Sequence, residues 1–205
     1  MRLAEGTRHS AIRQPEAYMV PMSQLWIPIL LSAVAVFFAS SVIHMASPWH
    51  KSDYPKMKNE DAVMDALRPL AIPPGDYFFP RPDGMAEMKS PAFTERVNRG
   101  PVILMTVMPN GVMGMGGTMV RWFIYLLVVS VFAAAQVASN GVHAHSARAF
   151  VFHETTLVAF AAYGLALWQL NIWYRRSLTI TIKSTVDALI YAAITGAIFA
   201  WCVPM

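Results

Sequence analysis

The sequence predicts an all-α membrane protein: a bundle of four transmembrane helices, with a small mixed extramembrane domain between helices 1 and 2. The first observation behind this prediction is a set of four apolar stretches of about twenty residues each. A helix rises about 1.5 Å per residue and the hydrocarbon layer is roughly 30 Å thick, so each stretch is long enough to cross a bilayer. The predicted transmembrane helices are residues 25–45, 119–138, 151–173 and 184–203.

Tryptophan placement and a low charge content support the same fold class. All six tryptophans lie at or near the ends of the four stretches. The indole ring has an apolar body and one N–H donor, so it prefers the boundary between lipid and water. Only 14% of the residues are charged, against roughly 25% in an average soluble domain.

Residues 1–23 form a polar N-terminal tail that carries three arginines. A basic tail before an apolar run is also typical of a signal peptide, but the run 25–45 is long and no small-residue cleavage site precedes the charged loop. We therefore expect an uncleaved first helix. Met19 and Met22 are alternative starts of translation, which would leave the preceding residues without a structural role.

Residues 46–118 contain eight basic and eight acidic residues and ten of the fourteen prolines. Asn59, followed by two acidic residues, predicts the start of a helix. Ser90 followed by Pro91 predicts the start of another, with Gly100 just beyond its end. We therefore expect a folded domain with two short helices rather than a disordered loop.

The runs 76–79 and 102–107 are rich in β-branched or aromatic residues and are bounded by proline and glycine, so they are expected to pair as strands. A domain of about 70 residues buries little surface by itself. Its exposed apolar side chains are therefore expected to contact the membrane face or a partner protein. The predicted contact residues are Tyr77, Phe78, Phe79, Ile103, Leu104 and Met105.

Small residues recur every fourth position in the last stretch. In lipid such a ridge lets two helix backbones approach closely, which predicts that this helix lies inside the bundle. The third stretch has a comparable predicted face of Thr155, Ala159, Ala162 and Ala166. The predicted packing residues of the last stretch are Ala188, Ala192, Gly196 and Ala200.

Polar residues near one end of the spans predict a structural clasp, because an ionisable group in hydrocarbon needs a partner or water. Asp187 with Arg121 is the natural pair. A proton pathway from Asp187 along Tyr191 and Thr195 is less favoured, because no second acid lies deeper in the membrane. The predicted clasp residues are His44, Arg121, Gln169, Asn171 and Asp187, with Lys183 nearby.

No cofactor is expected and no metal site is favoured. A haem would need axial ligands at similar depth, whereas His44 and His153 lie at opposite ends of their spans. Methionine thioethers suit Cu(I), but flexible packing contacts are the favoured role of the methionines here. The less favoured metal candidates are His143, His145, His153, Met108, Met113 and Met115.

The charge distribution predicts the orientation and argues against nucleic-acid binding. The net charge of +4 is spread singly through loops and forms no binding motif. Basic residues concentrate near the span ends next to the 46–118 and 174–183 loops. The long loop is therefore expected in the cytoplasm and both termini outside. No serine, cysteine or carboxylate lies in a recognisable catalytic arrangement, so an enzyme is not expected.

Several short stretches resemble an uncharacterised family of small bacterial multi-span membrane proteins. They are 41–45 (SVIHM), 49–54 (WHKSDY), 74–77 (PGDY), 106–111 (TVMPNG), 167–169 (LWQ), 173–174 (WY) and 187–191 (DALIY). The resemblance covers residues 25–204. It implies a location in the bacterial cytoplasmic membrane and carries no activity, cofactor or small-molecule substrate.

Taken with the exposed apolar residues and the small-residue ridge, the sequence predicts a non-catalytic accessory or scaffold subunit that binds other membrane proteins. The alternative is a small transporter or a protein that handles copper or another transition metal.

Overall fold

The computed structural model describes residues 19–112, 114–142 and 147–203. The chain divides into two compact units. The first, here called the bundle, comprises Met1–His50 and Gly116–Met205, and the second, the 51–115 unit, comprises Lys51–Met115. The predicted tail up to residue 18 and the candidate ligands His143, His145 and Met113 lie outside the described residues.

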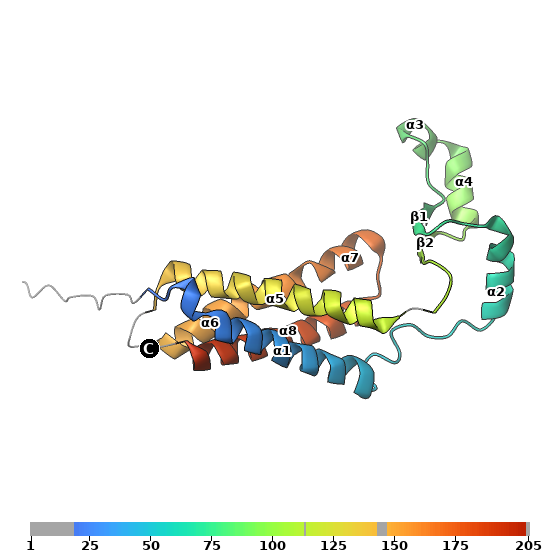
Figure 1. Cartoon of the computed structure of the whole chain (residues 1–205). Helices are drawn as coiled ribbons and strands as arrows, with labels where there is room; N and C mark the ends of the chain where they lie inside the picture. Colours follow the sequence, from blue (N-terminus) through green and yellow to red (C-terminus); the bar gives the residue numbers. More distant parts are fainter. Residues whose placement is uncertain (1–18, 113, 143–146, 204–205) are drawn as a thin grey trace, which may run out of the picture. The chain divides into compact units, whose positions relative to one another are not determined.

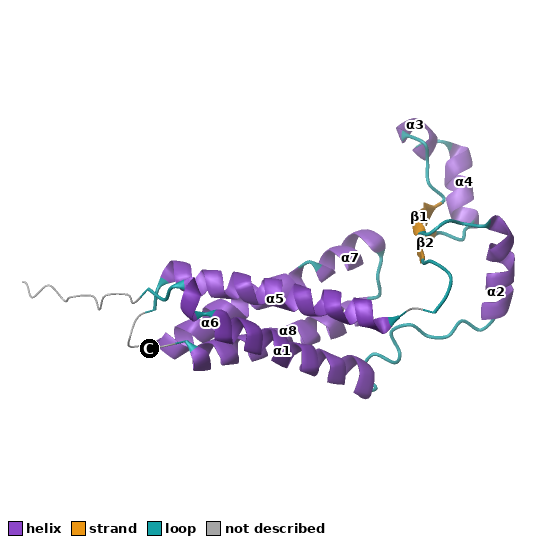
Figure 2. Ribbon diagram, in the orientation of Figure 1, coloured by secondary structure: helices purple, strands orange, loops and turns teal. Residues whose placement is uncertain are grey.

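In its described residues the bundle contains four helices long and apolar enough to cross a membrane, which confirms the predicted fold class (Figures 1 and 2). The protein is therefore a multi-pass membrane protein. The spans are α1 (Trp26–Ser41) with the π-helical turn η2 (Val42–Ala46), α5 (Met115–Asn140), α6 (Ala147–Phe160) continued by the π-helical turn η4 (Ala161–Leu165) and α7 (Leu167–Tyr174), and α8 (Leu178–Cys202). A short 3-10 turn, η1 (Met22–Gln24), precedes α1.

Helix α8 packs closely on both α1 and α6. Its contact with α6 depends on Gly196, where a Cβ atom would lie 1.9 Å from Thr156 Oγ1 and 2.9 Å from the Phe152 carbonyl oxygen. One end of η4 also lies near α8, although less closely, since a Cβ at Gly164 would lie 3.1 Å from Ala188 Cβ. Of the predicted packing residues, Ala188, Ala192 and Gly196 are buried and Ala200 is half-buried.

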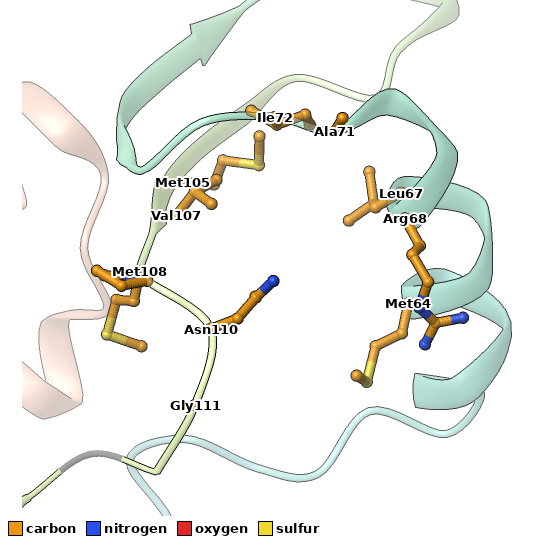
Figure 3. Close-up of a pocket in the computed structure, with 11 residues that line it drawn as sticks. Met64, Leu67, Arg68, Ala71, Ile72, Met105, Val107, Met108, Asn110 and Gly111 are labelled. Atoms are coloured by element: carbon orange, nitrogen blue, oxygen red, sulfur yellow. The ribbon is translucent and has the colours of Figure 1, made fainter.

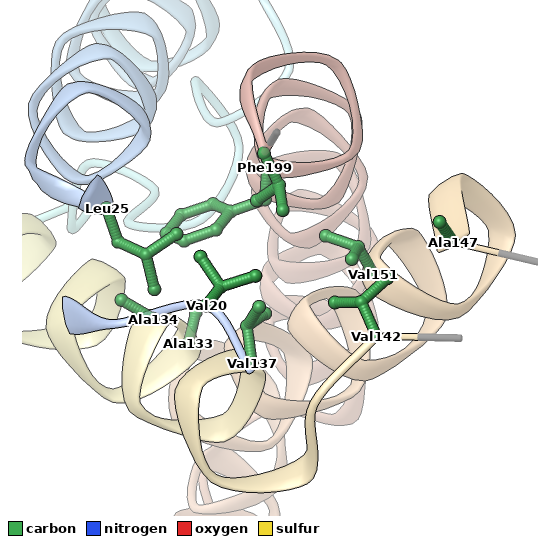
Figure 4. Close-up of a cluster of buried hydrophobic side chains, with 10 residues drawn as sticks. Val20, Leu25, Ala133, Ala134, Val137, Val142, Ala147, Val151 and Phe199 are labelled. Atoms are coloured by element: carbon green, nitrogen blue, oxygen red, sulfur yellow. The ribbon is translucent and has the colours of Figure 1, made fainter. Parts of the chain in front are cut away.

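The buried apolar side chains of the bundle form two clusters. Figure 4 shows one of them, in which Phe199 of α8 and Leu25 meet small side chains of α5 and Val151 of α6. The other cluster joins Leu126 of α5 to Tyr163 and Tyr191. All four spans therefore contribute to one continuous helical body.

Hydrogen bonds supplement the van der Waals contacts where α5 meets its neighbours. Ser32 Oγ of α1 lies 3.0 Å from Ser130 Oγ of α5, and both side chains are buried. Near the other end of α5, Trp122 Nε1 donates to Ser40 Oγ at 2.9 Å. The Tyr125 hydroxyl donates to the Ala162 carbonyl at 2.8 Å. Such bonds hold helices together in lipid, where the hydrophobic effect does not drive helix association.

The third span differs from the face predicted for it. Thr155 and Ala159 are buried as expected, but Ala162 and Ala166 are exposed, and Tyr163 and Gly164 are buried instead. The reason is η4, because a π-helical turn contains more residues than an α-helical turn and rotates everything that follows. Beyond it α7 diverges from the direction of α6 (Figure 1).

The 51–115 unit contains helices and the expected strand pair. Its helices are α2 (Glu60–Leu67), α3 (Met85–Met88) and α4 (Pro91–Arg99), with a 3-10 turn η3 (Arg68–Leu70) after α2. The strands β1 (Gly75–Phe79) and β2 (Ile103–Val107) pair antiparallel, with Tyr77 opposite Met105. Ser90 caps α4 as predicted, since its hydroxyl accepts a hydrogen bond from the Phe93 N–H at 3.1 Å.

The close contact at Gly196 can be tested by replacing it with alanine. The added methyl group must displace Thr156 and the α6 backbone, so Gly196→Ala should lower the free energy of unfolding by about 1 to 3 kcal/mol. Denaturation of the detergent-solubilised protein, followed by circular dichroism, measures this difference.

Gly116→Ala is the matched control, because a Cβ there meets nothing within 4 Å and the position lies in α5. Alanine is the better helix former, so this variant should keep or slightly raise the stability. Equal stability changes in the two variants would contradict the close contact between α6 and α8.

Candidate functional site

A group of polar and aromatic side chains gathers where the first span ends against α8. It consists of His44, Trp49, His50, Lys183 and Asp187, and is called the span-end cluster below. His44 belongs to η2, Trp49 and His50 follow in the adjoining turn, and the other two residues lie on α8. Segments distant in the sequence therefore meet at this point.

Asp187 is the centre of the span-end cluster. Its carboxylate is buried, and the side chain is only 5% exposed. His50 Nε2 lies 2.9 Å from Asp187 Oδ2, and Trp49 Nε1 donates to Asp187 Oδ1 at 3.2 Å. The turn after the first span thus supplies polar groups to both oxygens of a carboxylate on the fourth.

The two imidazoles lie together. The rings of His44 and His50 are stacked, with centroids 4.2 Å apart and planes 17° from parallel. Each ring offers a nitrogen that, with an Asp187 oxygen, belongs to a set of three atoms all within 4.8 Å of one another. Asp187 is buried, His50 is half-buried and His44 is exposed, so the group is open on the His44 side.

Local backbone structure explains how His44 and His50 come together. The Ser47 N–H donates to the Val42 carbonyl at 3.0 Å, which closes the π-helical turn around His44. The Ser47 hydroxyl then accepts a hydrogen bond from the Trp49 N–H at 3.2 Å. Lys183 Nζ donates to the Trp49 carbonyl at 2.7 Å and lies over the Trp49 ring. The turn is therefore tied to α8 independently of Asp187.

The other residues of the predicted clasp do not join Asp187. The Arg121–Asp187 pair is not formed among the described residues, and the Arg121 side chain is exposed. Gln169 is exposed on α7. Asn171 Nδ2 instead donates to the Arg176 carbonyl at 2.6 Å, where it stabilises the end of α7. The sequence prediction places Trp49 and His50 in the long loop, so it does not include their contacts with Asp187.

The metal candidates among the described residues belong to different parts of the chain. His153 is exposed and its Nδ1 lies 3.3 Å from Glu154 Oε1. Glu154 also accepts a hydrogen bond from Gln136 Nε2 at 2.7 Å. Met115 is exposed at the start of α5, whereas Met108 lines a groove of the 51–115 unit. Of the candidate methionines that the structure describes, Met108 and Met115 therefore belong to different segments.

That groove lies between α2 and the end of β2, and is called the methionine groove (Figure 3). It is open, with a volume of about 640 Å³. Apolar side chains dominate its lining, while Arg68 and Asn110 add polar groups. The apolar lining residues include Met64, Leu67, Ile72, Met105, Val107 and Met108.

The six predicted partner-contact residues lie on both faces of the strand pair. Phe78 and Leu104 lie opposite each other and are both exposed, at 51% and 48%. The residues on the other face, Tyr77, Phe79, Ile103 and Met105, are half-buried. This division follows from the two-residue period of a strand. The sequence prediction instead treats all six residues as one contact surface.

Comparisons with protein-family models, curated proteins and solved structures return no match for this chain.

The hydrogen bond from Trp49 to Asp187 can be tested by replacing Trp49 with phenylalanine. Trp49→Phe keeps an aromatic ring but removes the N–H that binds the Asp187 carboxylate. Hydrogen bonds to charged groups contribute roughly 1.5 to 3 kcal/mol when buried, and Trp49 is partly exposed, so a loss of about 1 to 2 kcal/mol is expected. Denaturant titration in mild detergent measures it.

Trp173→Phe is the control, since Trp173 is 77% exposed. Its stability should equal that of the unchanged protein. A Trp49→Phe variant as stable as Trp173→Phe would show that the bond to Asp187 contributes nothing to the bundle.

Proposed function

We propose that this protein is a non-catalytic accessory subunit of a larger membrane complex, which it binds through the 51–115 unit. One observation carries the proposal: among the described residues of this unit, Phe93 alone is buried. A unit of this size with so small a core leaves much apolar surface exposed to water. Contact with another protein would cover that surface.

The methionine groove is the best candidate for this contact. Unbranched methionine side chains adapt to differently shaped apolar partners, and they recur on protein surfaces that bind helices. Met64 and Met108 at the groove are more than half exposed. The occupant we propose is an apolar segment of a second integral membrane protein, because four spans keep this chain at a bilayer.

Charge favours a protein over an anionic lipid surface or a nucleic acid as the partner. Residues 51–115 carry eight basic and eight acidic side chains, so their net charge is zero. Several of these charges are paired locally, as in Arg96 with Glu87 and Arg99 with Glu95. A neutral surface lacks the excess of positive charge by which phosphate groups are attracted.

The rival proposal from the sequence is a small transporter or metal-handling protein. It predicts a chain that works alone, whereas an accessory subunit stays bound to its complex after mild detergent extraction. Crosslinking at the methionine groove separates the two.

A photo-crosslinking amino acid at Met105 should give one discrete adduct in native membranes, because Met105 lines the groove. Without crosslinking, the partner identified in this adduct should itself remain in the membrane after an alkaline carbonate wash, as expected for an integral protein. The same amino acid at Glu95, which is 73% exposed on α4, should give none.

Leu67→Glu should abolish the Met105 adduct, because an apolar segment that binds in the groove would have to strip water from the carboxylate. Leu70→Glu is the matched control, since Leu70 is 64% exposed and lies outside the groove. An adduct that survives Leu67→Glu, or a monomer that crosslinks to nothing, would refute this function.

We also propose that the membrane is the bacterial cytoplasmic membrane, with the 51–115 unit in the cytoplasm and both chain ends outside. The orientation is supported by the concentration of lysine and arginine near the span ends beside residues 46–118 and 174–183. The bacterial membrane is supported by the family resemblance of residues 25–204.

Cysteine labelling tests this orientation, because Cys202 is the chain's single cysteine. In a Cys202→Ser background, Arg148→Cys should react with a membrane-impermeant maleimide in intact cells. Lys58→Cys should react only after the membrane is permeabilised. The reverse pattern would place the 51–115 unit outside.

A further inference from the structure

The span-end cluster combines three side chains that are common metal ligands. Asp187 lies nine residues after the first residue of α8, which is about 14 Å along the helix axis. A carboxylate at that position inside a span is costly unless positive charge or hydrogen-bond donors offset its own charge. His44 and His50 offer two imidazole nitrogens to the same place.

The donor set has a clear chemical preference. Two imidazole nitrogens and one carboxylate oxygen suit borderline divalent ions of the first transition series, of which Zn²⁺ is the commonest in such sites. Calcium and magnesium prefer oxygen ligands only, and Cu(I) prefers sulfur. The nitrogen and oxygen ligands of the cluster therefore do not favour Cu(I), the ion that methionine thioethers would suit.

The three ligand atoms can bind one ion once the His44 ring turns out of its stack on His50. Bonds of about 2.0 to 2.1 Å to a tetrahedral ion place two ligand atoms roughly 3.4 Å apart. The three atoms already lie within 4.8 Å of one another. The His44 side chain is exposed, so its ring has room to reorient until its nitrogen faces the ion. The backbone of the turn is already fixed by its bonds to Lys183 and within η2.

We propose that His44, His50 and Asp187 bind one divalent transition-metal ion, with Zn²⁺ the preferred species. Asp187 supplies the negative charge and His50 the second ligand on the buried side. His44 completes the set from the exposed side. With three protein ligands, the fourth position of a tetrahedral ion is left for water or a ligand from a partner.

A second-sphere contact supports the site. Trp49 Nε1 donates to Asp187 Oδ1, the oxygen other than the one facing His50. Such an outer hydrogen bond orients a carboxylate so that its remaining oxygen faces the ion. This assignment is independent of the proposed docking role, because every residue in it belongs to the bundle.

Isothermal titration of the full-length protein with Zn²⁺ tests the proposal. The chain has six histidines, so His9, His143, His145 and His153 are first replaced by alanine. His44 and His50 then remain, and a purification tag without histidine keeps the count at two. One Zn²⁺ per chain is expected. Co²⁺ should give a visible absorption band that reports the coordination geometry.

His44→Ala and His50→Ala should each weaken Zn²⁺ binding by more than the roughly tenfold loss typical of removing an outer-shell partner. Each should also abolish the Co²⁺ band. Asp187→Asn should act in the same direction. Because His44 is exposed, His44→Ala should fold even if replacement of the buried aspartate prevents folding.

Glu154→Gln is the matched control, since Glu154 is a carboxylate on α6 outside the cluster. It should bind Zn²⁺ as the background protein does. Binding should also weaken at about pH 5.5 relative to about pH 7.5, because protons compete with the ion for imidazole.

Two results would overturn the proposal. One is the absence of Zn²⁺ binding in the background protein, which would leave the cluster as a hydrogen-bonded clasp. The other is binding that His44→Ala and His50→Ala leave unchanged, which would place the ion elsewhere.

Discussion

Close contact between α6 and α8 is the interaction on which the rest of the bundle depends. In lipid, apolar side chains gain little by leaving one hydrocarbon environment for another, so helices must be held by tight packing and hydrogen bonds. Gly196 allows that packing, because any larger residue would meet Thr156 and the backbone of α6. With α8 fixed in this way, Asp187 and Lys183 have defined places against the turn that follows the first span.

The features that could be predicted from the sequence were those with a short repeat. Span length and the four-residue spacing of small residues that ends at Ala200 are both local patterns. Among the described residues the structure has four helices of the expected length, and most of the small residues at that spacing are buried. The start of α4 at Ser90 and Pro91 could be predicted because a helix cap depends only on neighbouring residues. The strand pairing was also predicted, since both runs are bounded by proline and glycine.

The features that could not be predicted depend on pairs of residues distant in sequence. Nothing local indicates that Asp187 meets His50 rather than Arg121, because 137 positions separate the two. A signal was nevertheless present: two histidines flank a Ser-Pro turn directly after the first span, and Asp187 is the only acid in the last one. The rotated face of the third span was missed because no α-helical repeat anticipates η4.

That π-helical turn also sets the angular phase of the third span. Each residue of a helix turns the chain by about 100°, so one residue more or less within η4 would rotate the whole of α7 by that angle relative to α6. The rotation would change which side of α7 lies against α8. An insertion or deletion in η4 would therefore alter the facing of every later residue of the span, whereas a substitution acts at one position.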